Sequence, residues 1–150
     1  MSQPQLIARR YHDHCHGLEF ASASLDYDAR FLRRKVIATD DGQSVLVDLS
    51  QTTSLNDGSA LILEDGREIR IQAAPEQLLE VTGDELMRII WHIGNRHTPC
   101  QIEANRVLIQ HDPVIQDMLG KLGASVREVT EPFTPEGGAY GHGRTHSHAH

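Results

Sequence analysis

The hydrophobic positions of this chain follow two different periods, and the change falls near residue 74. From residue 5 to about residue 73, short apolar and β-branched runs alternate with Gly-containing turns, as in LEFASASL, RKVIATDDGQSVLVDLS and NDGSALILEDGREIRIQAA. Period-two alternation broken by DG turns is typical of strands joined by hairpins. We therefore predict an all-β module of about six strands, built as a small sandwich or barrel.

A helical period begins after Ala74 and Pro75. Residues 77–81 predict a short strand, and Thr82-Gly83-Asp84 then opens a helix that Gly94 is expected to end. Four apolar residues occupy positions i, i+3, i+4 and i+7 of this helix, namely Leu86, Ile89, Ile90 and Ile93. One face of the helix is therefore expected to pack on a sheet.

The next segments predict a hairpin, a second helix and a last strand. Residues 99–103 and 106–110 read as two strands joined by a turn, and residues 124–129 as another strand. Between them, Asp112 is a natural N-cap, Pro113 suits the first helical position, and Gly123 ends the helix. The apolar face of this second helix is expected to hold Val114, Ile115, Met118, Leu119 and Leu122. The order β-α-β-β-α-β is the ferredoxin-like arrangement.

The last stretch, GGAYGHGRTHSHAH, has closely spaced glycines and one large side chain, Tyr140. Such a segment cannot bury enough apolar surface to offset the entropy of ordering. We therefore expect an α+β protein of three parts: a β-rich domain over residues 1–74, a ferredoxin-like domain over residues 75–136, and a disordered His-rich tail over residues 137–150.

Composition narrows the possible partners. The formal net charge of -7 argues against nucleic acid and anionic membranes, which reward clustered Lys and Arg. The N-terminus has no apolar signal-peptide region, and no 18 apolar residues run together, so we expect a cytoplasmic, soluble protein. The two cysteines, Cys15 and Cys100, form no CxxC pair and suggest no disulfide framework.

Histidine is the unusual component, with ten residues against 14 Lys and Arg. It is the commonest side-chain metal ligand. In a ferredoxin-like sheet, His97 in the GNRH junction and His111 before the Asp112 cap lie at one edge. The tail is expected to start from the outer strand at that edge, roughly 14 Å away across three strand spacings, and to reach across. The edge and tail candidates for metal binding are His97, His111, His142, His146, His148 and His150.

Weaker candidates lie elsewhere. His92 on the first helix is more often a polar-face residue than a ligand. In HDHCHG a strand would place His12, His14 and His16 on one face and Cys15 on the other, although a solvated edge strand looks the same. Trp91 faces away from the apolar stripe of its helix, which favours a second contact surface and a symmetric dimer with its two-fold axis near His97.

The stretches WHIGNRHTPCQIE, HDPVIQDMLGKLGASV and EPFTPEGGAYGHG resemble the UreE family of urease accessory metallochaperones. The resemblance implies a nickel carrier that is a homodimer through its ferredoxin-like domains. It also implies an N-terminal domain that engages a partner protein or peptide, and delivery of nickel to the urease activation complex, in which a GTPase is the direct partner.

By the same resemblance, His97 from each subunit is the principal nickel ligand, with His111 and the tail histidines as further ligands. Some members carry another histidine where this chain has Pro113, and HDHCHG is not a recognised family feature.

Two other functions were weighed against nickel delivery. A general buffer or sensor for nickel, zinc or copper would also explain HDHCHG and the tail, because imidazole suits all three metals. A hydrolase would need Asn95 and Arg96 to bind a phosphate. The chain has no Gly-rich anion loop to support this, and it contains no HExxH, nucleophile-elbow or Walker A sequence. We therefore expect a metal carrier, and not an enzyme.

Overall fold

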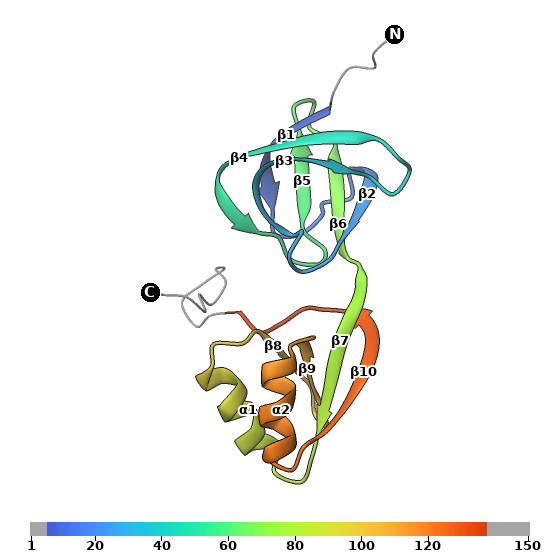
Figure 1. Ribbon diagram of the computed structural model, residues 1–150. Coiled ribbons are helices and arrows are strands. Elements are labelled where there is room, and N and C mark those ends of the chain that lie inside the picture. The colour runs from blue at the N-terminus through green and yellow to red at the C-terminus, as the bar shows by residue number, and fades with distance from the viewer. Residues whose placement is uncertain (1–5, 138–150) are drawn as a thin grey trace. The chain divides into compact units, whose positions relative to one another are not determined.

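A computed structural model describes residues 6–137, which form two compact units that divide between Ala74 and Pro75. The first unit is a six-stranded sheet, and the second is a four-stranded sheet with two helices (Figure 1). Among residues 6–137 no helix is long and apolar enough to cross a membrane.

The N-terminal unit contains only strands, as predicted. Its sheet has the order β2-β6-β5-β1-β4-β3, in which β1 pairs with β4 and β2 with β6 in parallel and the other neighbours are antiparallel. Its core is aliphatic and centres on Val45, Val47, Leu61, Ile69 and Ile71. The strands are β1 (Leu6–His12), β2 (Glu19–Leu25), β3 (Phe31–Ala38), β4 (Ser44–Ser54), β5 (Ala60–Leu63) and β6 (Glu68–Ala73).

Only the first residue of the HDHCHG stretch lies in a strand. Strand β1 ends at His12, and the chain then forms a loop that leads to β2. The backbone N–H groups of His16 and Leu18 donate to the side-chain carboxylate of Glu68, which replaces strand pairing there. The predicted alternation of histidines and Cys15 between two strand faces is therefore wrong.

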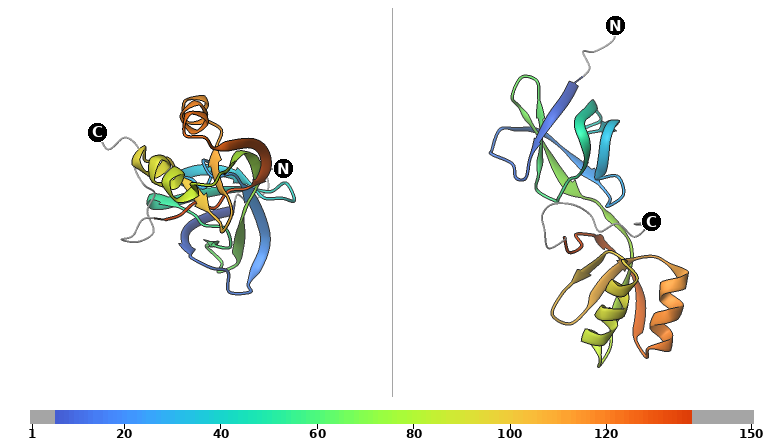
Figure 2. Two further views of the ribbon diagram at one scale, coloured as in Figure 1. Left: turned by 90° about the horizontal axis from the view of Figure 1, so that it is seen from below. Right: turned by 90° about the vertical axis from the view of Figure 1, so that its left-hand side faces the viewer.

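The C-terminal unit has the predicted β-α-β-β-α-β order. Its sheet runs β10-β7-β9-β8, with every neighbouring pair antiparallel, so that β7 and β8 are parallel, as the ferredoxin-like topology requires. Figure 1 and Figure 2 show both helices on one side of this sheet. The elements are β7 (Pro75–Thr82), α1 (Leu86–Asn95), β8 (Cys100–Ile102), β9 (Val107–Gln110), α2 (Pro113–Lys121) and β10 (Ser125–Pro132).

Fewer residues of each helix are fully buried than the sequence suggested. On α1, Ile89 and Ile93 are buried and Leu86 and Ile90 are half-buried, as predicted. On α2, the Asp112 carboxylate caps the first turn as expected. Ile115 and Leu119 are the buried pair of α2.

Two residues predicted for the buried face of α2 are largely exposed. Val114 is 64% exposed because it lies about 140° around the helix from Leu119 at 100° per residue. Leu122 is 37% exposed because it is the C-cap, beyond the last helical residue.

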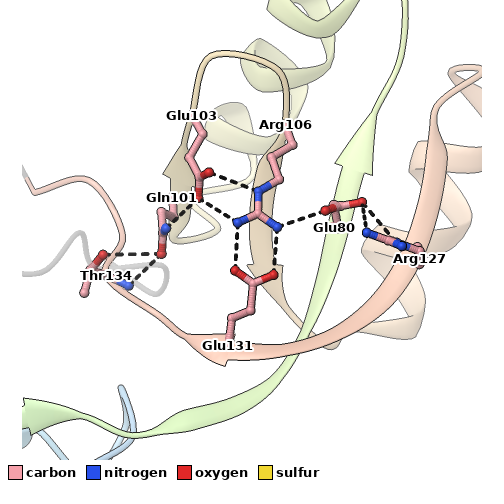
Figure 3. A network of polar contacts seen from close by, with 7 residues as sticks. All are labelled: Glu80, Gln101, Glu103, Arg106, Arg127, Glu131 and Thr134. Atoms are coloured by element: carbon pink, nitrogen blue, oxygen red, sulfur yellow. Dashed lines mark hydrogen bonds and ion pairs between the residues drawn. The ribbon is translucent and has the colours of Figure 1, made fainter.

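A polar network covers part of the sheet face opposite the helices. Arg106, at the start of β9, donates to the carboxylates of Glu80, Glu103 and Glu131 at 2.7–3.2 Å (Figure 3). These hydrogen bonds hold the pKa values of Glu80 and Glu131 below the ordinary value for glutamate. One guanidinium thus joins β7, β9, β10 and the β8–β9 turn.

Candidate metal site

His97 ends helix α1 in an unusual backbone conformation. Its φ is +58°, and among residues 6–137 it is the only non-glycine residue with a positive φ. Its N–H donates to the Gly94 carbonyl at 2.9 Å, and the next N–H, of Thr98, donates to the Ile93 carbonyl at 3.4 Å. This pair of hydrogen bonds is the Schellman motif, in which the left-handed position is usually glycine. The expected stop at Gly94 is wrong, because the helix runs on to Asn95.

Helix α2 ends in the same motif with the usual residue. Gly123, at φ +81°, donates to the Gly120 carbonyl, and Ala124 donates to the Leu119 carbonyl, both at 3.1 Å. A left-handed conformation costs an L-residue with a side chain about 1–2 kcal/mol. The chain therefore carries that cost at His97 and avoids it at Gly123. Strain of this kind is typical of functional positions, and the His97 side chain is exposed to solvent.

His111 lies at the same edge of the sheet as His97. In the β8–β9 register Cys100 pairs with Ile109, which places the start of β8 beside the end of β9. His97 precedes Cys100 by three residues, and His111 follows Ile109 by two. Nε2 of the half-exposed His111 lies 3.5 Å from a carboxylate oxygen of Glu128 on β10. This contact places a carboxylate beside one of the two ring nitrogens of His111.

The chain after β10 does not leave from the far side of the sheet. Thr134 donates its N–H to the side-chain oxygen of Gln101 at 2.9 Å (Figure 3). Glu136 donates its N–H to the Cys100 carbonyl at 2.8 Å. Residues 133–136 thus bring the chain to strand β8. The expected 14 Å gap between the tail's starting point and the His97 edge is therefore wrong, because the tail begins one residue beyond Glu136.

Cys100 sits where the returning segment meets β8. Burial, and secondarily the nearby Glu136 carboxylate, raise the pKa of its thiol. Cys100 is half-buried and packs against the core of the C-terminal unit, whereas His97 and His111 are exposed at this edge.

Helix α1 presents an apolar surface to solvent. Met87 is 86% exposed and Trp91 63% exposed. With Arg88 and His92 they line an open cavity of about 430 Å³. The His92 ring lies against the Trp91 ring edge to face, with ring centres 5.1 Å apart. Trp91 thus faces away from the sheet, as predicted.

The described part of the chain holds no ready-made metal cage. Within residues 6–137 no group of three or more His, Cys, Asp or Glu side chains is arranged to hold an ion. The sheet edge brings His97 and His111 together, whereas His12, His14, Cys15 and His16 lie in the other unit. The predicted ligands His142, His146, His148 and His150 fall outside the described residues.

Sequence reasoning missed Glu128 and Gln101 at this edge. Glu128 faces His111 from a strand 17 residues later, and Gln101 holds the returning segment across 33 residues. Neither belongs to a motif, and only their positions in the sheet connect them to the histidines. The left-handed φ of His97 also had no sequence signal, because Gly94 offered a more obvious helix stop.

Known proteins match the chain over nearly its whole length. Residues 11–74 match the family described as UreE urease accessory protein, N-terminal domain, and residues 76–150 match its C-terminal domain.

Among curated relatives, the urease accessory protein UreE of Ruegeria sp. (strain TM1040) is 66% identical over 147 residues, covering 97% of this chain and 84% of the relative. The same-named protein of Ruegeria pomeroyi is 68% identical over 127 residues, covering 85% of each. That of Rhodobacter capsulatus is 55% identical over 127 residues, covering 85% of this chain and 81% of the relative. The chain therefore belongs to the UreE family of urease accessory proteins, which are chaperones and not enzymes.

Proposed function

We propose that this protein is a cytoplasmic nickel carrier that delivers Ni(II) to the urease activation complex. The observation that carries the proposal is His97, an exposed imidazole held at a left-handed position where glycine is favoured. Folding alone gives no reason to keep a histidine there, because glycine satisfies the same helix end at Gly123. A binding role for the imidazole does give such a reason.

His97 alone is a poor site, so the ligand set must be completed from elsewhere. We propose that a symmetric dimer brings His97 beside His97 of the partner subunit, and that His111 adds further donors from the same sheet edge. The interface would be the exposed α1 surface around Met87 and Trp91, because buried aromatic side chains are enriched at interface centres. Sedimentation, which measures the oligomeric state, tests this surface. Trp91→Glu should yield monomers, whereas Val114→Glu, at an exposed position on α2, should not. Dimers of Trp91→Glu would contradict it.

The tail is proposed to supply the remaining ligands, His142, His146, His148 and His150. Its starting point supports this, because Glu136 is hydrogen-bonded to Cys100, three residues from His97. From Gly137 to His142 the chain can span up to about 17 Å at roughly 3.3–3.6 Å per residue. Covalent reach thus allows even the first tail histidine to meet His97.

Calorimetric titration of Ni(II) into the full chain tests the ligand set. His97→Ala should remove the tightest site, and a chain shortened to residues 1–136 should keep that site but bind fewer ions. Lys121→Ala is the control, since it removes an exposed side chain near the end of the other helix, and it should bind as the wild type does. Unchanged stoichiometry and affinity in both His97→Ala and the shortened chain would refute the proposal.

Exposed ligands suit transfer, because an incoming donor can replace them one at a time. By affinity alone copper would displace nickel, so selectivity must come from metal supply and from docking to the correct partner. We propose the urease accessory GTPase as that partner, with the N-terminal unit contributing to docking. The test loads the protein with equal amounts of Ni(II) or Zn(II) and measures how much complex it forms with the GTPase. A complex that forms only with Ni(II) supports delivery.

A general buffer or sensor for nickel, zinc or copper is the second candidate. The gathering of His12, His14 and His16 favours it, because that cluster belongs to the N-terminal unit, whereas His97 belongs to the C-terminal unit. Absence of any nickel-dependent complex with the GTPase, together with equal retention of Ni(II) and Zn(II), would favour this candidate over delivery.

A further inference from the structure

Three histidine rings gather in the loop that connects β1 to β2. The His12 and His16 ring centres are 4.7 Å apart and those of His14 and His16 are 4.8 Å apart. All three residues are exposed. The His16 ring therefore lies within contact distance of both others, on the solvent side of the N-terminal sheet.

A buried carboxylate fixes this loop. Glu68, at the start of β6, is 1% exposed and accepts hydrogen bonds from the backbone N–H groups of His16 at 3.0 Å and Leu18 at 2.9 Å. It also accepts from the Cys15 thiol at 3.5 Å. Burial opposes the charge on Glu68, but these donors outweigh it and lower the pKa of the carboxyl group. By accepting these hydrogen bonds, the Glu68 carboxylate holds the loop between β1 and β2 in place.

The same carboxylate orients the His16 ring. His16 Nδ1 lies 3.3 Å from a Glu68 oxygen. An ionised carboxylate only accepts hydrogen bonds, so Nδ1 must carry the proton and Nε2 is left with its lone pair. A carboxylate behind a histidine ring is the usual arrangement around metal-binding histidines, where it sets the tautomer and raises ligand basicity. Here the carboxylate is fully buried and the open nitrogen belongs to an exposed ring.

We propose that His12, His14 and His16 form a separate binding site for a divalent transition-metal ion, with Glu68 as the positioning residue. A metal–nitrogen distance of about 2.1 Å places each ring centre roughly 3.2 Å from the ion, so two ligand rings lie roughly 4.5–5.3 Å apart. The observed separations of 4.7 and 4.8 Å fall in that range. The donor nitrogens do not yet converge, and ring rotation in exposed side chains occurs within nanoseconds.

The surroundings define the kind of ion. An open cavity of about 310 Å³, lined in part by His12, His16 and Glu68, leaves room for the ion and its water ligands. Cys15 is engaged by Glu68 and only half-exposed, so the donor set is three imidazoles. Three neutral nitrogens suit Cu(II) and Zn(II), and Cu(II) should bind more tightly. This site lies in the other unit from His97 and does not depend on the proposed nickel site.

Histidine side-chain NMR of the full chain carrying His97→Ala tests the proposal with Zn(II) as the probe. The first equivalents of Zn(II) should shift the His12, His14 and His16 rings together, with the metal on Nε2 of His16 and the Nδ1 proton retained toward Glu68. His14→Ala removes an exposed ring without touching the Glu68 contacts and should weaken zinc binding at the loop at least tenfold. Glu68→Gln should weaken it about 10–100-fold, as loss of a supporting carboxylate does.

The control is His92→Ala in the same background, which should leave the loop signals and their zinc response unchanged. The proposal is overturned if the three rings show no shift until zinc exceeds the chain severalfold, or if His14→Ala leaves the response of His12 and His16 unchanged. Because His97 is absent throughout, failure of this test would leave the nickel site at the C-terminal edge unaffected, and the reverse also holds.

Discussion

Replacing His97 by glycine should make the protein more stable while removing the proposed principal metal ligand. The left-handed φ of +58° costs a residue with a side chain about 1–2 kcal/mol. Glycine removes that cost but has more freedom in the unfolded chain, which offsets about 0.4–1 kcal/mol. Because the His97 ring is exposed, its removal loses little packing energy. The net expected gain for His97→Gly is about 0.5–1 kcal/mol.

Thermal unfolding without metal measures this gain. In a domain of this size, 1 kcal/mol shifts Tm by about 4–8 °C, so His97→Gly should raise Tm by about 2–8 °C. Trp91 is the only tryptophan in the chain and lies on α1, so its fluorescence reports on the C-terminal unit. Chelator in the buffer and a fixed protein concentration remove the effects of bound metal and of association on Tm.

The second helix supplies the reciprocal control. Gly123→Ala places a side chain at φ +81° in the same motif and should lower Tm by a similar amount, with nickel binding unchanged. His97→Ala keeps the strained backbone without the ring and should lose nickel binding with little gain in Tm. A Tm for His97→Gly at or below that of the wild type would refute the strain argument, and wild-type nickel affinity in that variant would refute the ligand role.

Three further outcomes are expected. Arg106→Met should lower the free energy of unfolding at neutral pH. Arg106 holds the pKa values of Glu80 and Glu131 low, so the stability that these carboxylates contribute is present above about pH 4.3 and is lost as the pH falls through their pKa values in the folded protein. In urea unfolding, the stability of the variant should therefore depend less on pH in that acidic range. Ile93→Ala should cost about 2–5 kcal/mol because Ile93 is fully buried, whereas Val114→Ala at a 64% exposed position should be nearly neutral in the same urea titration. Nickel loading, measured by equilibrium dialysis, should weaken as the pH falls through about 6.5, since imidazole must be neutral to bind; loading that is constant from pH 8 to pH 5 would contradict imidazole ligation.

Those parts of the fold that depend on local periodicity could be predicted from the sequence. The spacing of Ile89 and Ile93 placed α1 on the sheet, and Asp112 followed by Pro113 placed the start of α2 correctly. Chain connectivity and handedness then determined the strand order, and with it the shared edge of His97 and His111. Alternating apolar runs and DG turns predicted the all-β unit, but they did not predict the order of its strands.

What could not be predicted depends on contacts between distant residues. Nothing in HDHCHG indicates that the Glu68 side chain, 52 residues after His16, accepts a hydrogen bond from the backbone of this segment and holds it as a loop. Similarly, the return of residues 133–136 to β8 depends on Gln101 and Cys100. Local sequence preference also misled at Gly94: the helix runs past this glycine to Asn95, and the left-handed residue after the C-cap is His97.

The two histidine groups share a physical design that suits a carrier. In each, the backbone is fixed by contacts that do not involve the open ring nitrogens: a Schellman helix end at His97, and the buried Glu68 carboxylate beneath His16. The proposed sites therefore cost the fold little beyond the strain at His97, because the aliphatic cores of the two units include none of these histidines. Because the rings remain at the surface, a competing ligand can replace them stepwise without opening the core. In the proposed carrier, release of the metal would thus be separated from unfolding, as repeated loading and unloading of an ion requires.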